Sequence, residues 1–100
     1  MATGAVLGMA TIGAANANLY TASGAASVVV NICNTNTAAV SIRLGIGTTS
    51  ATIAQHLWKD KVIPANDSIQ YTGIMLDATN KYLVGYGSTT GIDFIAMGVA

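Results

Sequence analysis

The chain has 100 residues, of which 52% are hydrophobic and only 8% are charged, and its four basic and four acidic side chains give a formal net charge of zero. This length predicts a single domain with one modest core. The hydrophobic content excludes charge-driven disorder, and the lack of a basic excess excludes a surface built for nucleic-acid phosphates. We therefore expect no nucleic-acid partner. Because little net repulsion opposes contact between copies, we also expect the protein to associate with itself.

The first 17 residues are apolar and uncharged, and three glycines interrupt them. They lack the positive start and continuous apolar core of a secretory signal, and no other stretch is hydrophobic enough to span a bilayer, so we expect no membrane partner. We interpret residues 1–17 either as an arm that packs on a neighbouring subunit or as a first strand of the domain at 18–100. Their removal should leave a folded domain that associates more weakly. The candidate interface residues in this segment are Val6, Leu7, Met9 and Ile12.

Beyond residue 17, short apolar segments alternate with clusters of Gly, Asn, Asp, Ser and Thr at a spacing of roughly ten residues, which is typical of a β-sandwich or barrel. The expected fold class is therefore all-β, a small antiparallel β-sandwich of seven to eight strands. The predicted strands cover residues 18–22, 27–34, 40–46, 50–63, 68–76, 81–87 and 92–99.

Two neighbouring segments give the clearest strand patterns. Segment 27–34 is largely apolar on both faces, which predicts a central strand. Asn and Thr at 34–37 predict a turn, and we expect that turn to form a hairpin with the next strand. In segment 40–46 the apolar residues alternate with Ser41, Arg43 and Gly45, which predicts one buried and one exposed face.

The segment 50–63 is compatible with two interpretations. Its apolar spacing also fits a short helix with Ser50 as N-cap, but the residue before Pro64 is pushed toward extended backbone, which favours a strand that ends at Ile63. In segment 68–76, Gly73 interrupts the alternation of apolar residues. This interruption predicts a β-bulge.

Few residues suggest chemistry. His56 lies four residues before Asp60, a separation of about 13 Å along a strand, so we interpret this single histidine as a surface residue. Cys33 has no second cysteine to pair with and is interpreted as a small buried residue. Asp67 and Asp77 fall in predicted turns, where Asp bonds the local backbone. We therefore expect no catalytic residue, no cofactor and no metal, and no enzymatic activity.

The only tryptophan, Trp58, lies among the charged neighbours Lys59 and Asp60. A lone tryptophan in such a setting is either part of the core or an anchor for contact with another subunit. We therefore include Trp58 among the candidate interface residues.

From residue 18 onward the sequence resembles a group of small structural proteins from the virions of tailed bacteriophages. The shared features are a Leu-Tyr pair, a Val-rich strand that ends in Cys-Asn, and an aliphatic-Arg-Leu strand. The matching pieces are Asn18-Leu19-Tyr20, residues 28–34, Val40-Ser41-Ile42-Arg43-Leu44, Val62-Ile63-Pro64-Ala65-Asn66 and Thr72-Gly73-Ile74-Met75-Leu76.

This resemblance implies a jelly-roll-like sandwich, symmetric copies within a particle and no cofactor. It predicts a virion protein whose partners are other copies of itself and other capsid or tail proteins, with capsid decoration, or cement, as the expected role. The alternative is a tail- or fibre-associated module that binds a host-surface glycan or receptor, with Trp58, Tyr71, Tyr82 or Tyr86 as stacking platforms.

Overall fold

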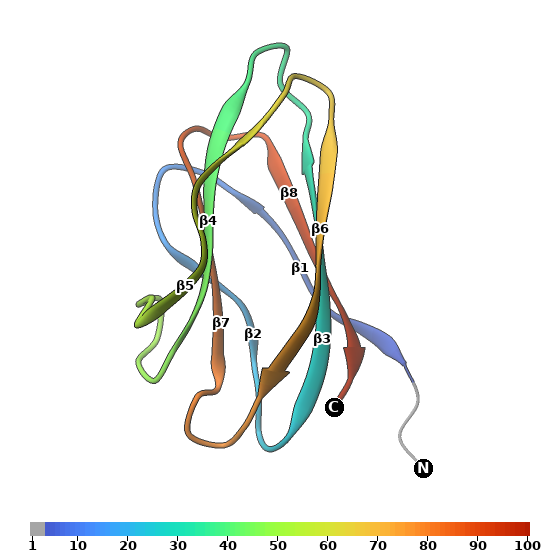
Figure 1. Ribbon diagram of the computed structural model, residues 1–100, viewed down its shortest axis with the longest axis vertical. Coiled ribbons are helices and arrows are strands. Elements are labelled where there is room, and N and C mark those ends of the chain that lie inside the picture. The colour runs from blue at the N-terminus through green and yellow to red at the C-terminus, as the bar shows by residue number, and fades with distance from the viewer. Residues whose placement is uncertain (1–3) are drawn as a thin grey trace.

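The computed structural model describes residues 4–100, which form eight β-strands and no helix (Figure 1). Within these residues there is accordingly no helical segment that is long and apolar enough to cross a membrane. The strands are β1 (Ala5–Ile12), β2 (Ala17–Thr21), β3 (Ala26–Asn34), β4 (Val40–Gly47), β5 (Gln55–Ile63), β6 (Ser68–Leu76), β7 (Tyr82–Gly87) and β8 (Ile92–Val99).

The strands form two four-stranded antiparallel sheets that pack face to face (Figure 1). One sheet has the order β1-β8-β3-β6 and the other has the order β2-β7-β4-β5. Only β4 and β5 are neighbours both in sequence and in a sheet, so every other connection passes from one sheet to the other. This arrangement is an eight-stranded jelly roll, which confirms the predicted all-β, jelly-roll-like sandwich.

The predicted hairpin at 34–37 is wrong. β3 pairs with β6 and β8, whereas β4 pairs with β5 and β7, so residues 35–39 connect the two sheets. The buried side chain of Asn34 explains this path: its amide nitrogen lies 2.9 Å from the carbonyl oxygen of Ala38, 3.2 Å from that of Ile63 and 3.1 Å from that of Pro64. Asn34 thus ties the connection to the end of β5 instead of turning it back along β3.

Several local predictions are confirmed. β3 lies between β8 and β6 and is therefore central in its sheet. Residues 55–63 form a strand and not a helix. Val28 of β3 is opposite Ile74 of β6, whereas Val30 of β3 is opposite Tyr71 of β6, so two residues of β6 face one residue of β3. One of these two residues is Gly73, which has a φ of 77°. This is the β-bulge that Gly73 predicts, with a positive φ that glycine adopts without strain.

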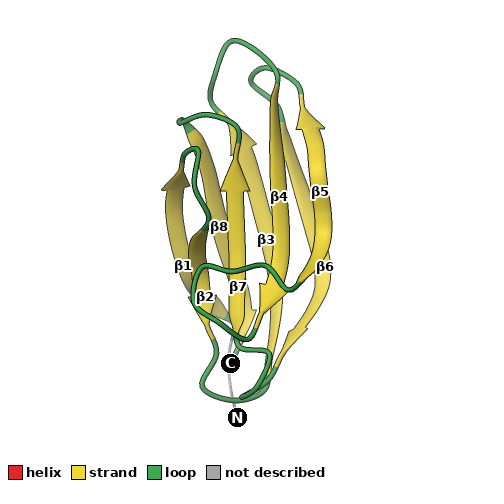
Figure 2. Cartoon of the chain, turned by 90° about the vertical axis from the view of Figure 1, so that its left-hand side faces the viewer, coloured by secondary structure: helices red, strands yellow, loops and turns green. Residues whose placement is uncertain are grey.

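β5 begins later than predicted because residues 48–54 fold across the outer face of the second sheet. Asn18 in β2 holds this loop: its Nδ2 donates to Ser50 Oγ at 2.8 Å, and its Oδ1 accepts the Ala51 N–H at 2.8 Å. Ile53 in the loop packs above Gly45, where a Cβ would lie 2.3 Å from the Ile53 Cγ2. Figure 2 shows the loop lying across β7 and β2.

The core fills the space between the sheets, and the two sides of the sandwich are closed differently. Beside β1 and β2 the backbones approach so closely that a Cβ at Gly8 would overlap the Leu19 carbonyl oxygen. Beside β5 and β6 the gap is filled by Trp58 and Tyr71, whose rings pack edge to face with their centroids 4.9 Å apart. The largest fully buried side chains are Val28, Val30, Ile32, Asn34, Ile42, Leu44, Ile63, Ile74, Leu83, Val84, Ile92 and Phe94.

Candidate assembly surface

The outer side of the β1-β8-β3-β6 sheet carries an apolar patch that we call the methionine face, next to polar residues such as Asn31, Gln70 and Asp93. Residues directly opposite each other on paired strands point to the same side of a sheet. Val6 is opposite Met97 and Met97 is opposite Val29, while Met9 is opposite Ile95. Met75 continues the surface on β6. The methionine face comprises Val6, Met9, Val29, Met75, Ile95 and Met97.

Exposure on the methionine face is greatest at its two margins. Met9 is 73% exposed and Val6 is 57% exposed on the edge strand β1, and Met75 is 67% exposed on the edge strand β6. On the inner strands β3 and β8, Val29, Ile95 and Met97 are half-buried because neighbouring side chains flank them on both sides. The most exposed part of the methionine face thus lies at the two edges of this sheet, while Val62 on β5 of the other sheet is also 59% exposed.

The N-terminal candidate residues divide into two sets. Val6 and Met9 point outward, whereas Ile12 is 3% exposed and belongs to the core, and Leu7 is half-buried against the core. Residues 5–12 form β1, which pairs with β8 along the edge of the sheet. A role for Val6 and Met9 in contact with another subunit stays a prediction, and the placement of the first three residues lies outside the described part of the chain.

Trp58 is half-buried on β5 and packs against the core. Its ring contacts Tyr71, and the Lys61 ammonium lies 5.9 Å from its centroid. These contacts give Trp58 a role in closing the sandwich beside β5 and β6. Contact between Trp58 and another subunit stays a prediction.

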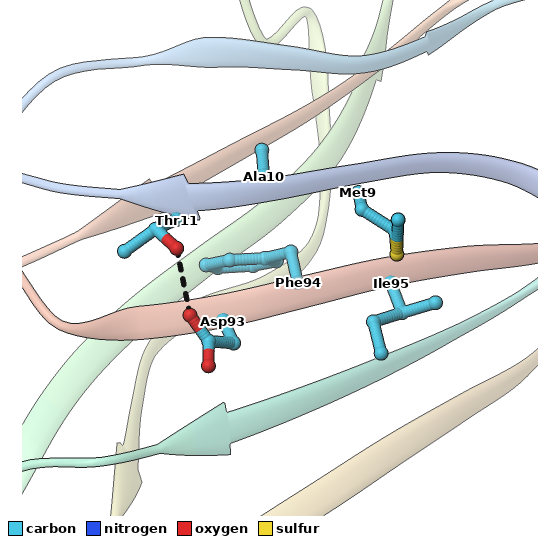
Figure 3. A pocket seen from close by; sticks show the side chains of 6 residues that line it. All are labelled: Met9, Ala10, Thr11, Asp93, Phe94 and Ile95. Carbon is cyan, nitrogen blue, oxygen red and sulfur yellow. Dashed lines mark hydrogen bonds between the residues drawn. The ribbon is translucent and has the colours of Figure 1, made fainter.

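A hollow of about 320 Å³ lies along β1 and β8 at one margin of the methionine face (Figure 3). Figure 3 shows the Met9 and Ile95 side chains at one end and Thr11 and Asp93 at the other, where the Thr11 hydroxyl donates to Asp93 Oδ1 at 2.7 Å. Asp93 is the one titratable group in its lining, which is otherwise mostly apolar. The hollow therefore offers an apolar contact with a single polar end.

The strands of the opposite sheet carry four of the eight charged side chains, Arg43, Lys59, Asp60 and Lys61. Arg43 on β4 donates through Nε to Asp60 Oδ1 on β5 at 2.8 Å, and its guanidinium lies 4.7 Å from the centroid of the Tyr86 ring. Asp60 adopts a φ of 54° at a shift in the β4–β5 register, where the extra residue lets its carboxylate reach Arg43. Asp60 is therefore paired with Arg43, and no bond joins it to His56 among the described contacts.

The predicted turn aspartates act on the local backbone. Asp67 Oδ1 accepts the Ser68 N–H at 2.8 Å, and Asp77 Oδ1 accepts the N–H groups of Asn80 at 2.7 Å and Thr79 at 2.9 Å. The bonds from Asn80 and Thr79 hold the pKa of the Asp77 carboxyl below its ordinary value of 3.8. Within residues 4–100, no three His, Cys, Asp or Glu side chains cluster as metal ligands would.

Sequence reasoning missed four members of the methionine face: Val29, Met75, Ile95 and Met97. The alternation within each strand places them outside, since their neighbours Val28, Val30, Ile74, Phe94 and Ala96 are buried. The signal that could have found them is an apolar residue at outward positions of several strands. What the sequence lacks is the order β1-β8-β3-β6, which brings positions 6, 9, 29, 75, 95 and 97 together.

No family model matches the chain, and no curated protein is similar to it. Solved structures with a similar fold include a chain from Bacillus endospore appendages, described as a novel family of disulfide-linked pili. It has 14% identity and a TM-score of 0.60, and the alignment covers 99% of this chain and 84% of that one. A chain from the Gx strain of infectious bursal disease virus has 9% identity and a TM-score of 0.52, with 97% of this chain and 32% of that chain covered. These identities show a shared fold.

Proposed function

We propose that this protein is a non-enzymatic structural subunit that works in many copies within a repetitive assembly. The observation that carries the proposal is the methionine face, a patch of six apolar residues on the outer side of one sheet, in a chain with a net charge of zero. Apolar surfaces of this kind mark contacts between proteins, and burying them needs no charged partner. The proposal is supported by the two similar folds, one from pili and one from a virus.

The assembly that we propose is the virion of a tailed phage, with this chain as a capsid decoration protein that stabilises the particle. The support comes from the sequence resemblance over residues 18–76, above all the Val-rich strand ending in Cys33-Asn34 and the Val40 to Leu44 strand. In this role the methionine face would lie against other copies or against the capsid proteins.

A filament subunit is a second candidate. It is favoured by the extent of the likeness to the pilus chain, which is matched over 84% of its own length, whereas only 32% of the viral chain is matched.

The alternative of a glycan-binding module has less support from the aromatic residues. Sugar stacking needs a free ring face, but Trp58 and Tyr71 contact each other, Arg43 covers Tyr86, and the Lys81 ammonium lies 5.4 Å from the Tyr82 centroid. The four rings named as stacking platforms therefore already have partners within the chain.

The test is to locate and count the protein in purified phage particles and in purified cell-surface filaments. Quantitative mass spectrometry gives copies per particle, and immunogold microscopy gives their position. Many copies over the capsid shell support the decoration role, and copies along a filament support the second candidate. A few copies at a tail tip would favour adhesion. Absence from every particle and filament would refute the structural role.

A further inference from the structure

The two sheets differ in how their edge strands are protected against pairing with another chain. Edge strands that avoid such pairing are short, interrupted by bulges or charged. In the β2-β7-β4-β5 sheet, β2 has five residues and one register shift. β5 carries Lys59, Asp60 and Lys61 and has two register shifts against β4. Both edges of this sheet are protected.

The edges of the β1-β8-β3-β6 sheet are less protected, because they are longer than β2 and uncharged. β1 has eight residues and β6 has nine, and neither strand contains a charged residue or a proline. Each strand has one register shift, with the remainder in regular antiparallel pairing. The three most exposed side chains of the methionine face, Val6, Met9 and Met75, lie on these same two strands. The unpaired backbone of the two edge strands therefore lies beside the most exposed side chains of the methionine face.

The direction of the strands makes these two edges complementary to each other. The sheet contains four strands and every pairing is antiparallel, so β1 and β6 run in opposite directions. If a second copy is placed in the same orientation beside the first, its β1 meets β6 in antiparallel fashion, and the alternation continues without interruption. A single type of contact, between β6 of one copy and β1 of the next, then pairs both of these edges in every copy.

We propose that copies of this chain join head to tail through backbone pairing of β6 in one copy with β1 in the next. The proposal rests on the proposed structural function and names its partner and contact. At the junction, Met75 of one copy comes to lie on the same outer surface as Val6 and Met9 of its neighbour, so the methionine face becomes continuous. Such a heterologous interface produces a ring if the rotation between successive copies closes on itself, and a filament if it does not.

This arrangement fixes the spacing of the assembly. Each added copy extends the sheet by four strands, which at about 4.8 Å per strand gives a repeat of roughly 19 Å along the hydrogen-bond direction. The normal twist of about 20 to 25° per strand adds a rotation of roughly 80 to 100° per copy. Cryo-electron microscopy of the assembled protein measures both values.

The test uses two blocked variants of the full chain, each with a lysine at one edge. Met9→Lys blocks the β1 edge and Met75→Lys blocks the β6 edge, and both positions are exposed, so the fold should tolerate them. In sedimentation velocity each variant alone should be a monomer, and an equal mixture should form a dimer because one competent β6 and one competent β1 remain. Circular dichroism checks that both variants are folded.

The matched control is Met97→Lys, which places the same charge on the same face but on the inner strand β8. Edge pairing predicts that this variant still forms the large assembly. Loss of assembly in Met97→Lys would instead show that copies stack face to face and would overturn the proposal. Dimers of either blocked variant alone would show like-with-like pairing, and a monomeric wild-type chain would show no pairing; both results also overturn it. Many copies in purified particles together with any of these results would leave the proposed function standing.

Discussion

The two sheets of this jelly roll share one core but present different surfaces to solvent. The outer side of β1-β8-β3-β6 carries the apolar methionine face and uncharged edge strands, with Asp93 as its charged residue. The other sheet carries the Arg43–Asp60 pair and two lysines on β5, and its face is partly covered by the loop at 48–54. The comparison teaches that two sheets which share one inward-facing core can differ in their outward faces, and it is the outward face that is available for assembly.

The largest effect on stability is expected for a substitution in the core that the two sheets share. Ile42 on β4 is 0% exposed, while Ser41 beside it is half-buried on the opposite side of the strand. Ile42→Asp should destabilise the protein by more than about 4 kcal/mol, because it places an unpaired charge in the core. Ser41→Asp should cost roughly 1 kcal/mol. Urea unfolding measures both values, and equal costs would contradict the assigned register.

A smaller effect is expected where the two sheets are joined. Asn34→Ala removes the buried amide that bonds the carbonyl oxygens of Ala38, Ile63 and Pro64, and it should cost about 2 to 3 kcal/mol. The control is Asn36→Ala, which removes an exposed bond to the Thr90 carbonyl oxygen and should cost less than about 1 kcal/mol. Thermal unfolding of the two variants under one set of conditions compares them directly.

Truncation of an apolar side chain should lower the stability of the protein when the side chain packs against the core, as Trp58 does on β5, and should leave it almost unchanged when the side chain is exposed, as Met9 is on β1. Trp58→Ala opens the side of the sandwich that Trp58 and Tyr71 close, and should cost about 1 to 2 kcal/mol. Met9→Ala removes an exposed side chain and should change stability by less than about 0.5 kcal/mol. Chemical unfolding provides the values, and a larger cost for Met9→Ala than for Trp58→Ala would show that the assigned inside and outside are reversed.

The smallest effect concerns pH. Because the Asn80 and Thr79 N–H groups lower the pKa of Asp77 in the folded protein, its ionised form stabilises the fold. That contribution is complete above the unfolded pKa, near 3.8, and is lost as the pH falls through the lower folded value. Asp77→Asn removes the titration. The stability difference between wild type and Asp77→Asn should therefore be constant above about pH 5 and should change below pH 3.8.

Deletion of residues 1–17 is a poor test of assembly in light of the structure. Sequence reasoning expects a folded domain after the deletion, but Ile12 is part of the core and β1 covers one edge of β8. The deletion would therefore remove core packing and sheet pairing together with the exposed Val6 and Met9. The Met9→Lys substitution separates these effects.

The sequence by itself determined the all-β class, the inward face of β4 and the bulge at Gly73, because each depends on alternation or backbone preference within a few residues. The resemblance to phage virion proteins added the jelly-roll expectation. Which strands pair was decided only by the tertiary structure, and for this reason the turn at 34–37 suggested a hairpin where the chain in fact changes sheets.

The same limit applies to the candidate site. Val6 and Met9 could be selected from the sequence as apolar residues without a clear place, but Ile12 and Leu7 could not be separated from them until β1 was placed against β8. The methionine face combines positions from β1, β3, β6 and β8, which are far apart along the chain. Local patterns indicate which side of its own strand a residue occupies, whereas the neighbours on that side are decided by backbone pairing between distant segments.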